Sequence, residues 1–264
     1  MKLYDQVHRI YNDLAAAGVG PVDPLVVDQL TPFDQYHYLG TSAVDAAIKS
    51  LHLQPGMRVL DIGSGLGGPA RYIADRCGAR VVAIDVQADL HQVATDLTRR
   101  CGLAGLVEHR CADILGGWDD EPFDAIVSFL CFLHIPNRAR LFEVCRRALR
   151  AGGGMYIEDY GRQRQPTDDE AEALRLKVQC VDLPTPAEYV AELYRAGLED
   201  VDLHDVTGDW QSFTASRLAM FRGARDRNVT VYGCDVVDGL DDFYATVAGL
   251  FKVGLIAGLQ ITAR

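Results

Sequence analysis

Val59-Leu60-Asp61-Ile62-Gly63-Ser64-Gly65-Leu66-Gly67-Gly68-Pro69-Ala70 is the stretch that decides the fold we expect for this chain. The apolar run over 57–62 predicts a buried strand, and apolar residues recur at helical spacing from position 70. Between them, glycines at 63, 65 and 67 can adopt positive φ angles and let a ligand approach the backbone closely. Strand, glycine turn and helix predict the opening of a nucleotide-binding βαβ unit.

Acidic residues follow three successive predicted strands. Asp61 ends the first strand, where a carboxylate could meet a cation. Asp85 ends a second strand and suits a pair of ribose hydroxyls, and Asp113 ends a third. Two structural alternatives stay open: Asp85 could cap a helix over 88–101, and Asp113 could be a turn residue. The Asp-x-Gly-x-Gly-x-Gly order differs from the Gly-x-Gly-x-x-Gly of NAD enzymes.

Strand and helix patterns alternate along the chain and predict an α/β fold with a Rossmann-like, doubly wound, mostly parallel sheet. Residues 1–50 are expected to form a helical cap, in which 26–40 has no clean period and Thr41 or Ser42 caps the following helix. Residues 51–264 are expected to form the core, with helical lid insertions at about 162–183 and 207–253. The expected elements are strands 57–62, 80–85, 106–112, 123–129, 154–159, 199–206 and 254–262, and helices 3–17, 69–77, 88–101, 137–149, 168–179, 185–196, 209–227 and 240–252.

The composition favours an enzyme that acts on a small molecule. The 264 residues carry a formal charge of −11, which opposes nonspecific binding to nucleic acid. No apolar run reaches the roughly 20 residues that span a bilayer, and the polar start of the chain predicts no secretory signal. Seven dispersed cysteines without a Cys-x-x-Cys pair predict a cytoplasmic protein with reduced thiols, and the lack of zinc-ligand spacing predicts no metal dependence. We expect a monomer or a homodimer.

The order and spacing of these motifs resemble those of the class I S-adenosylmethionine (SAM) methyltransferases. The resemblance rests on the 61–67 turn, on the acids that end three strands, and on Phe123-Asp124-Ala125-Ile126-Val127-Ser128. It implies SAM as cofactor and S-adenosylhomocysteine (SAH) as product. The glycines would lie along the methionine part, Asp85 at the ribose and Asp113 at the adenine. The residues implied at the cofactor are Asp61, Gly63, Ser64, Gly65, Gly67, Asp85, Val86, Gln87, Ala112, Asp113, Ile114, Ser128 and Leu130.

Within this superfamily the chain most resembles amine methyltransferases that act on phosphoethanolamine or on sarcosine and dimethylglycine. Asp-Ile-Gly-Ser-Gly-Leu-Gly-Gly at 61–68 is similar to the former, and His134 matches its active-site histidine. Tyr160 matches a substrate-pocket tyrosine. Tyr36-His37-Tyr38 stands where the family has a lid with a tyrosine that pairs with the histidine. The resemblance therefore implies His134 and Tyr38 as catalytic residues, and Tyr36, His37 and Tyr160 as substrate-binding residues.

Three departures from that family point to a less polar acceptor. Leu130 stands where the family has an acid, and its phosphate-binding arginine and tyrosine fall near Gln179 and Val181. The sequence thus predicts a SAM-dependent transfer of a methyl group to a small molecule, with an amine nitrogen as the expected acceptor. His134 would be the base or the partner of Tyr38 or Tyr36; the structural alternative is a helix cap or a wall residue.

Other functions stay open at this point. Within the methyltransferases, the alternative is an O- or C-methyltransferase of a natural-product scaffold, because the acceptor atom cannot be read from these motifs. Outside them, the alternatives are a non-catalytic SAM- or nucleotide-binding protein and an NAD-dependent oxidoreductase.

Overall fold

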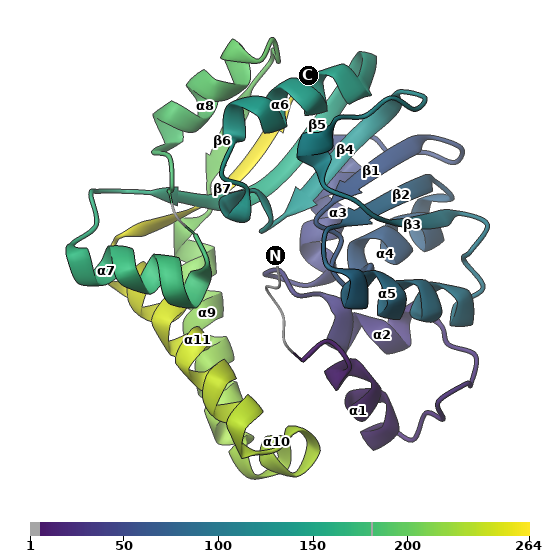
Figure 1. Cartoon of the computed structure of the whole chain (residues 1–264), viewed down its shortest axis with the longest axis vertical. Coiled ribbons are helices and arrows are strands. Elements are labelled where there is room, and N and C mark those ends of the chain that lie inside the picture. Colours follow the sequence, from purple (N-terminus) through teal and green to yellow (C-terminus); the bar gives the residue numbers. More distant parts are fainter. Residues whose placement is uncertain (1–5, 181) are drawn as a thin grey trace.

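A seven-stranded sheet forms the centre of the molecule in the computed structural model, which describes residues 6–180 and 182–264 (Figure 1). The strand order is β3-β2-β1-β4-β5-β7-β6. All neighbouring pairs from β3 to β5 are parallel, and β7 runs antiparallel to both β5 and β6. The strands are β1 (Arg58–Ile62), β2 (Arg80–Asp85), β3 (Val107–Cys111), β4 (Phe123–Phe129), β5 (Leu149–Arg162), β6 (Asp202–Asp205) and β7 (Ile256–Ala263).

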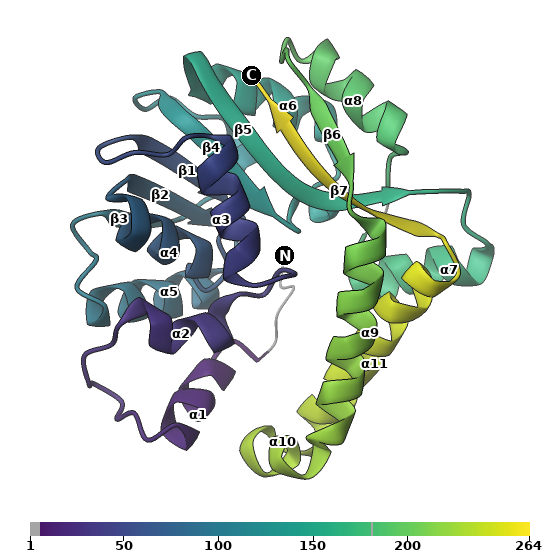
Figure 2. The same cartoon turned by 180° about the vertical axis from the view of Figure 1, so that it is seen from behind.

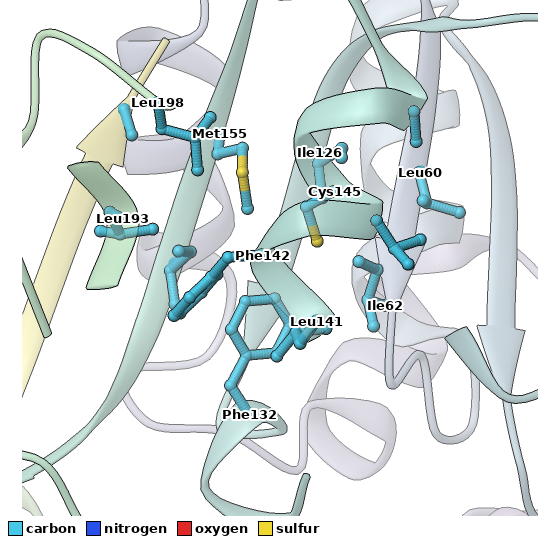
Figure 3. Close-up of a cluster of buried hydrophobic side chains, with 14 of the residues drawn as sticks. Leu60, Ile62, Ile126, Phe132, Leu141, Phe142, Cys145, Met155, Leu193 and Leu198 are labelled. Atoms are coloured by element: carbon cyan, nitrogen blue, oxygen red, sulfur yellow. The ribbon is translucent and has the colours of Figure 1, made fainter. Parts of the chain in front are cut away.

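Helices cover both faces of this sheet, because neighbouring strand residues point to opposite sides. Val59 packs in the cluster formed with α3 and α4, whereas Leu60 packs in the cluster formed with α6 and α8. Figure 2 shows α3 in front of the sheet, and Figure 3 shows the second cluster, where Phe132, Leu141 and Phe142 gather. The doubly wound, mostly parallel fold is confirmed. The core helices are α3 (Thr41–Ser50), α4 (Gly68–Cys77), α5 (Ala88–Arg100), α6 (Arg138–Ala148) and α8 (Pro186–Arg195).

The N-terminal segment packs beside the glycine turn and contains more helix than predicted. It forms α1 (Arg9–Ala16) and α2 (Val27–Asp34). Helix α2 lies within residues 26–40, where no helix was predicted because Pro32 interrupts the apolar pattern. The expected cap of α3 was wrong: Gly40 precedes the helix, and no side chain caps it. A buried ion pair between Asp34 and Arg71, 2.8 Å from Oδ2 to Nη2, joins α2 to α4.

A helical arm projects from the sheet between β6 and β7 (Figures 1 and 2). It consists of α9 (Thr207–Gly223), α10 (Arg225–Tyr232) and α11 (Cys234–Lys252). One helix was expected over 209–227; the chain instead turns at Ala224 and begins α10. α10 contacts α1, where the Asn12 amide donates to the Val231 carbonyl at 3.1 Å.

The other predicted insertion, at 162–183, contains α7 (Asp168–Ala173) and a π-helical turn over Leu174–Val178. The capping box of α7, in which the Thr167 hydroxyl accepts from the Glu170 amide, explains where this helix begins. No helix among the described residues is long and apolar enough to cross a membrane.

Candidate functional site

The glycine turn follows β1 at the edge of the sheet where the parallel strands end, next to the point at which the strand order reverses between β1 and β4. Such switch points open a crevice in doubly wound sheets. Gly63 has φ of 75° and its amide donates to the Ile84 carbonyl at 2.9 Å; a Cβ there would stand 2.2 Å from Sγ of Cys131. Gly65 has φ of 53°, and a Cβ there would meet no atom within 4 Å. The turn thus packs against the core at Gly63 and leaves open space at Gly65.

Asp85 holds this turn in place. Its Oδ2 accepts from the Gly65 amide at 3.0 Å, and its Oδ1 accepts from the Gln87 amide at 2.9 Å. Asp85 does not cap α5, because the N-cap residue is Gln87 and its side chain makes no cap bond. Burial raises the pKa of Asp85, although these amides offset part of that effect. The carboxylate therefore stands beside the glycine turn, where a ribose could contact it.

Asp61 is the buried acid of the site. Its side chain is 1% exposed, and its Oδ2 has no hydrogen-bond partner in the described part of the chain. Burial, together with the neighbouring Asp85, raises the pKa of Asp61 to about 7. An unpartnered buried carboxylate oxygen is costly and suits a cationic ligand. Asp61 and the open space at Gly65 thus fit the ammonium group of the methionine part of SAM.

The residues that follow β2 and β3 divide into surface and core positions. Asp113 is exposed, and its Oδ1 accepts from the Leu115 amide at 2.9 Å, so it caps a short 3₁₀ turn. Val86 is 40% exposed and Ala112 is half-buried, and both stand at the open edge of the sheet. Ile114 was predicted beside the adenine, but its side chain packs in the core.

Two predicted cofactor residues, Ser128 and Leu130, lie at the end of β4. The buried Ser128 hydroxyl donates to the Ile62 carbonyl at 3.0 Å and so ties β4 to β1. Leu130 has φ of 52°, and its amide donates to the Glu158 carbonyl at 2.7 Å. Leu130 also lines the large cavity of the molecule, and the next residue, Cys131, packs against Gly63 of the glycine turn.

A cavity of about 770 Å³ lies between the N-terminal segment, the ends of β4 and β5, and the helical arm. Five predicted site residues line it, namely Tyr36, Tyr38, Leu130, His134 and Tyr160. The glycine turn does not line it. Of the residues predicted at the cofactor, Leu130 is thus the one that lines this cavity in the described part of the chain.

His134 ends the 3₁₀ turn Phe132–His134 after β4 and lines this cavity. Its Nδ1 lies 3.2 Å from the Gln179 carbonyl oxygen. Because a carbonyl only accepts, Nδ1 carries the proton, and Nε2 of the neutral ring holds a free lone pair. Burial lowers the pKa of His134, and the bond to Gln179 offsets part of this effect. His134 is therefore neutral at pH 7 and able to accept a proton.

The tyrosine that was predicted to pair with His134 has a different partner. The Tyr38 hydroxyl shares a short hydrogen bond with the Tyr160 hydroxyl, and both rings pack against Trp210. Burial raises the pKa of Tyr38 to about 12, so it stays protonated. Tyr36 instead lies under the Arg9 guanidinium, whose carbon is 5.5 Å from the ring centroid.

The predicted substrate-binding role of His37 is not supported by its position. His37 is 3% exposed, does not line the cavity, and stacks on Phe129 with 4.8 Å between ring centroids. Its Nδ1 bonds to the Tyr38 carbonyl, and its Nε2 bonds to the Gln35 side chain. Burial lowers the pKa of His37 to about 4, which fits a neutral packing residue.

The sequence analysis did not foresee the contact of Gln179 with His134, and it missed Arg217. Gln179 acts through its backbone carbonyl and adopts a left-handed conformation with φ of 55°, for which the side chain gives no signal. Arg217 reaches the cavity from α9, more than 80 residues beyond His134 in the chain. Val181, part of the predicted less polar wall, lies outside the described residues.

Comparisons with known proteins agree with this geometry. Residues 60–157 match a family model described as a methyltransferase domain. The chain is 32% identical over 188 residues to phosphoethanolamine N-methyltransferase 1 of Zea mays, covering 71% of this chain and 37% of that protein. It is 28% identical over 182 residues to a glycine/sarcosine/dimethylglycine N-methyltransferase of Actinopolyspora halophila, covering 67% of this chain and 32% of that protein.

The fold also matches a solved structure, that of phosphoethanolamine N-methyltransferase 2 of Haemonchus contortus in complex with phosphomonomethylethanolamine and SAH. The TM-score is 0.80 at 20% identity, over 98% of this chain and 57% of that chain. The chain spans about two fifths of the length of the plant relatives it matches. Residues 60–157 are therefore a methyltransferase domain, and the chain has the fold of the class I SAM-dependent methyltransferases.

Proposed function

We propose that this protein transfers the methyl group of SAM to a small-molecule acceptor bound in the 770 Å³ cavity, with His134 as the general base. The observation that carries the proposal is the hydrogen bond from Nδ1 of His134 to the Gln179 carbonyl, which leaves Nε2 as the unprotonated nitrogen of a ring that lines the cavity. A positioned base with a pKa near or below neutrality is suited to remove a proton from an amine or hydroxyl nucleophile.

The glycine turn, Asp61 and Asp85 would hold SAM, which supplies a methyl group already activated for transfer. The chain's own residues then have three tasks. Leu130 and the aromatic wall exclude water, the Tyr38–Tyr160 pair orients the acceptor by its hydroxyls, and His134 accepts the acceptor's proton on Nε2. General bases of this kind contribute about 10²- to 10⁴-fold to a rate.

An amine nitrogen is the first acceptor class to test, because the relatives named above are N-methyltransferases. A hydroxyl acceptor is the second candidate, and one observation favours it. The lining residues next to His134 in the chain or bonded to it, Leu133 and Gln179, carry no carboxylate that could face a protonated amine. The carboxylates that line the cavity, Asp13 and Asp235, come from α1 and α11 in the described chain.

Calorimetric titration with SAM and SAH tests the cofactor. We expect micromolar binding that Asp85→Ala weakens at least tenfold, because the alanine cannot bond to the Gly65 amide. Asp75→Ala, on the exposed side of α4, is the control and should bind as the wild type does. Absence of SAH binding to the folded wild-type chain would refute the proposal.

A panel of amines, phenols and enols, with methylated product detected by mass spectrometry, tests the base. His134→Gln should lower turnover about 10²-fold or more while SAH affinity and melting temperature stay unchanged. His204→Gln is the matched control, since His204 is exposed and pairs with Asp202 on β6. Full turnover by the folded His134 variant would remove the base from the mechanism.

A further inference from the structure

The cavity is much larger than the amines on which the named relatives act. Its 770 Å³ equals the space of about 25 water molecules at about 30 Å³ each, and it falls in the range of pockets that hold drug-sized ligands. It extends from His134 and Tyr160 at the sheet to Asn228 and Tyr232 on α10, so its length follows the helical arm. An acceptor that fills this space is an extended molecule.

Most of the wall along the arm is apolar or aromatic. Met220, Phe221, Leu240, Phe243 and Tyr244 line it from α9 and α11. Apolar walls with few polar groups select ligands by burial of apolar surface, and the polar groups fix their orientation. The charged groups in this wall therefore decide how the acceptor lies.

Arg217 is the charged group that stands out. Its Nη2 donates to the His37 carbonyl at 3.0 Å, and its guanidinium carbon lies 4.6 Å from the Phe213 ring centroid and 5.3 Å from that of Tyr38. No carboxylate pairs with it in the described parts of the chain. Other arginines of the arm do have acidic partners: Arg222 bonds to Asp241 at 2.7 and 2.8 Å, and Arg225 bonds to Asp238 at 2.7 Å.

The other charges of the cavity do not neutralise Arg217. Lys177 is paired with Asp242 at 2.7 Å. Arg9 and Asp13 both lie on α1, where the Arg9 guanidinium stacks over the Tyr36 and Tyr232 rings and Asp13 accepts from the Tyr232 hydroxyl. Asp235 lies in the first turn of α11, and Arg217 contacts Tyr244, nine residues further along the same helix. Nine residues of helix place Asp235 about 14 Å from Tyr244 along the axis. A guanidinium keeps its charge at any ordinary pH, so this cation calls for an anionic ligand.

On the basis of the proposed function, we infer that the acceptor is an extended, mainly apolar molecule with one carboxylate, and that Arg217 binds this carboxylate. A planar guanidinium matches a carboxylate in shape and can donate two parallel hydrogen bonds. The contacts with Phe213 and Tyr38 hold the guanidinium in the wall, so little side-chain freedom is lost on binding. The carboxylate would then fix which acceptor atom faces His134.

Three probes of equal chain length test the charge preference: decanoate, decan-1-ol and decyltrimethylammonium. Each is titrated by calorimetry into the protein in the presence of saturating SAH. We expect decanoate to bind at least tenfold more tightly than the other two. Arg217→Met should abolish this preference and leave decanol affinity within twofold, whereas Arg222→Met should change neither value.

A second variant tests the size of the occupant. Gly239 on α11 lines the cavity, and a Cβ there would meet no atom within 4 Å. Gly239→Leu should fit the helix, fill part of the cavity, and remove the gain in affinity from hexanoate to decanoate. Gly249→Leu, also on α11 with open space at Cβ but away from the cavity, should keep that gain.

The outcomes separate the inference from the proposed function. If SAH binds but decanoate has no advantage over decanol, or keeps it in Arg217→Met, the carboxylate inference is wrong and methyl transfer stands. If SAH does not bind while decanoate still depends on Arg217, the methyl-transfer proposal fails and the anion site remains. Tighter binding of decyltrimethylammonium would overturn the inference in favour of a cationic acceptor.

Discussion

Replacing Arg71 by methionine should destabilise the protein more than any surface substitution. Arg71 and Asp34 are both 0% exposed, and Nη2 lies 2.8 Å from Oδ2. With an effective dielectric constant of about 20, two charges about 4 Å apart attract by about 4 kcal/mol. Removing one partner of a buried pair costs about 3–5 kcal/mol, because the other charge is left uncompensated. Among the described residues, the Asp34 carboxylate would keep the hydrogen bond donated by Nε2 of the Gln35 side chain at 2.9 Å.

Urea unfolding of Arg71→Met, Asp34→Leu and the double variant measures this coupling. We expect each single variant to lose about 3–5 kcal/mol of unfolding free energy. The double variant should lose less than Arg71→Met alone, because no buried charge is left without a partner. A loss below about 1 kcal/mol for Arg71→Met, or strictly additive losses, would refute the view that this pair holds α2 against α4.

Two further predictions concern the glycine turn and its acid. Gly63→Ala should lower the melting temperature, because its methyl carbon would stand 2.2 Å from Sγ of Cys131. Gly65→Ala should stay folded and bind SAH at least tenfold more weakly. Equal effects of the two variants on stability and on SAH binding would contradict this prediction. The pKa of Asp61 rises from 3.8 to about 7 on folding. Between these two pH values the Asp61 carboxyl is therefore mostly protonated in the ligand-free folded protein and mostly ionised in the unfolded chain. The contribution of Asp61 to the free energy of unfolding is greatest below pH 4 and falls by up to about 4 kcal/mol as the pH rises to 7. Asp61→Asn should remove this part of the pH dependence of stability. An unchanged pH profile of stability in that variant would disprove the prediction.

The parts of the fold that follow from periodicity were predictable from the sequence. The strands from β1 to β4 and the helices between them carry regular apolar patterns, and their observed ends differ from the predicted ones by a residue or two. Helix α2 was hidden by Pro32, and the break between α9 and α10 follows Gly223, a signal that the prediction of one helix over 209–227 passed over. Local patterns report local structure, so elements whose ends depend on tertiary packing escape them.

The candidate site was predictable where backbone and side chain act within one motif. Asp85 could be placed beside the glycine turn because both end neighbouring strands. The partner of Tyr38 could not be found, since Tyr160 is 122 residues away and pairs with it only after β5 and the N-terminal segment have packed together. Arg217 lay outside any motif, because its proposed role depends on the three-dimensional structure, in which no carboxylate of the described residues pairs with it.

The insertion point of the arm bears on how such a protein can change its specificity over evolution. β6 and β7 are antiparallel neighbours, with Asp205 opposite Leu259, so the three arm helices occupy the position of a hairpin loop. Lengthening a loop costs little, about 0.6 kcal/mol of closure entropy for each doubling. The arm could therefore be exchanged, extended or shortened while the edge pairing of the sheet stays intact. If the arm holds the acceptor as proposed, acceptor choice and cofactor chemistry would thus lie on two heritable modules that can diverge at different rates.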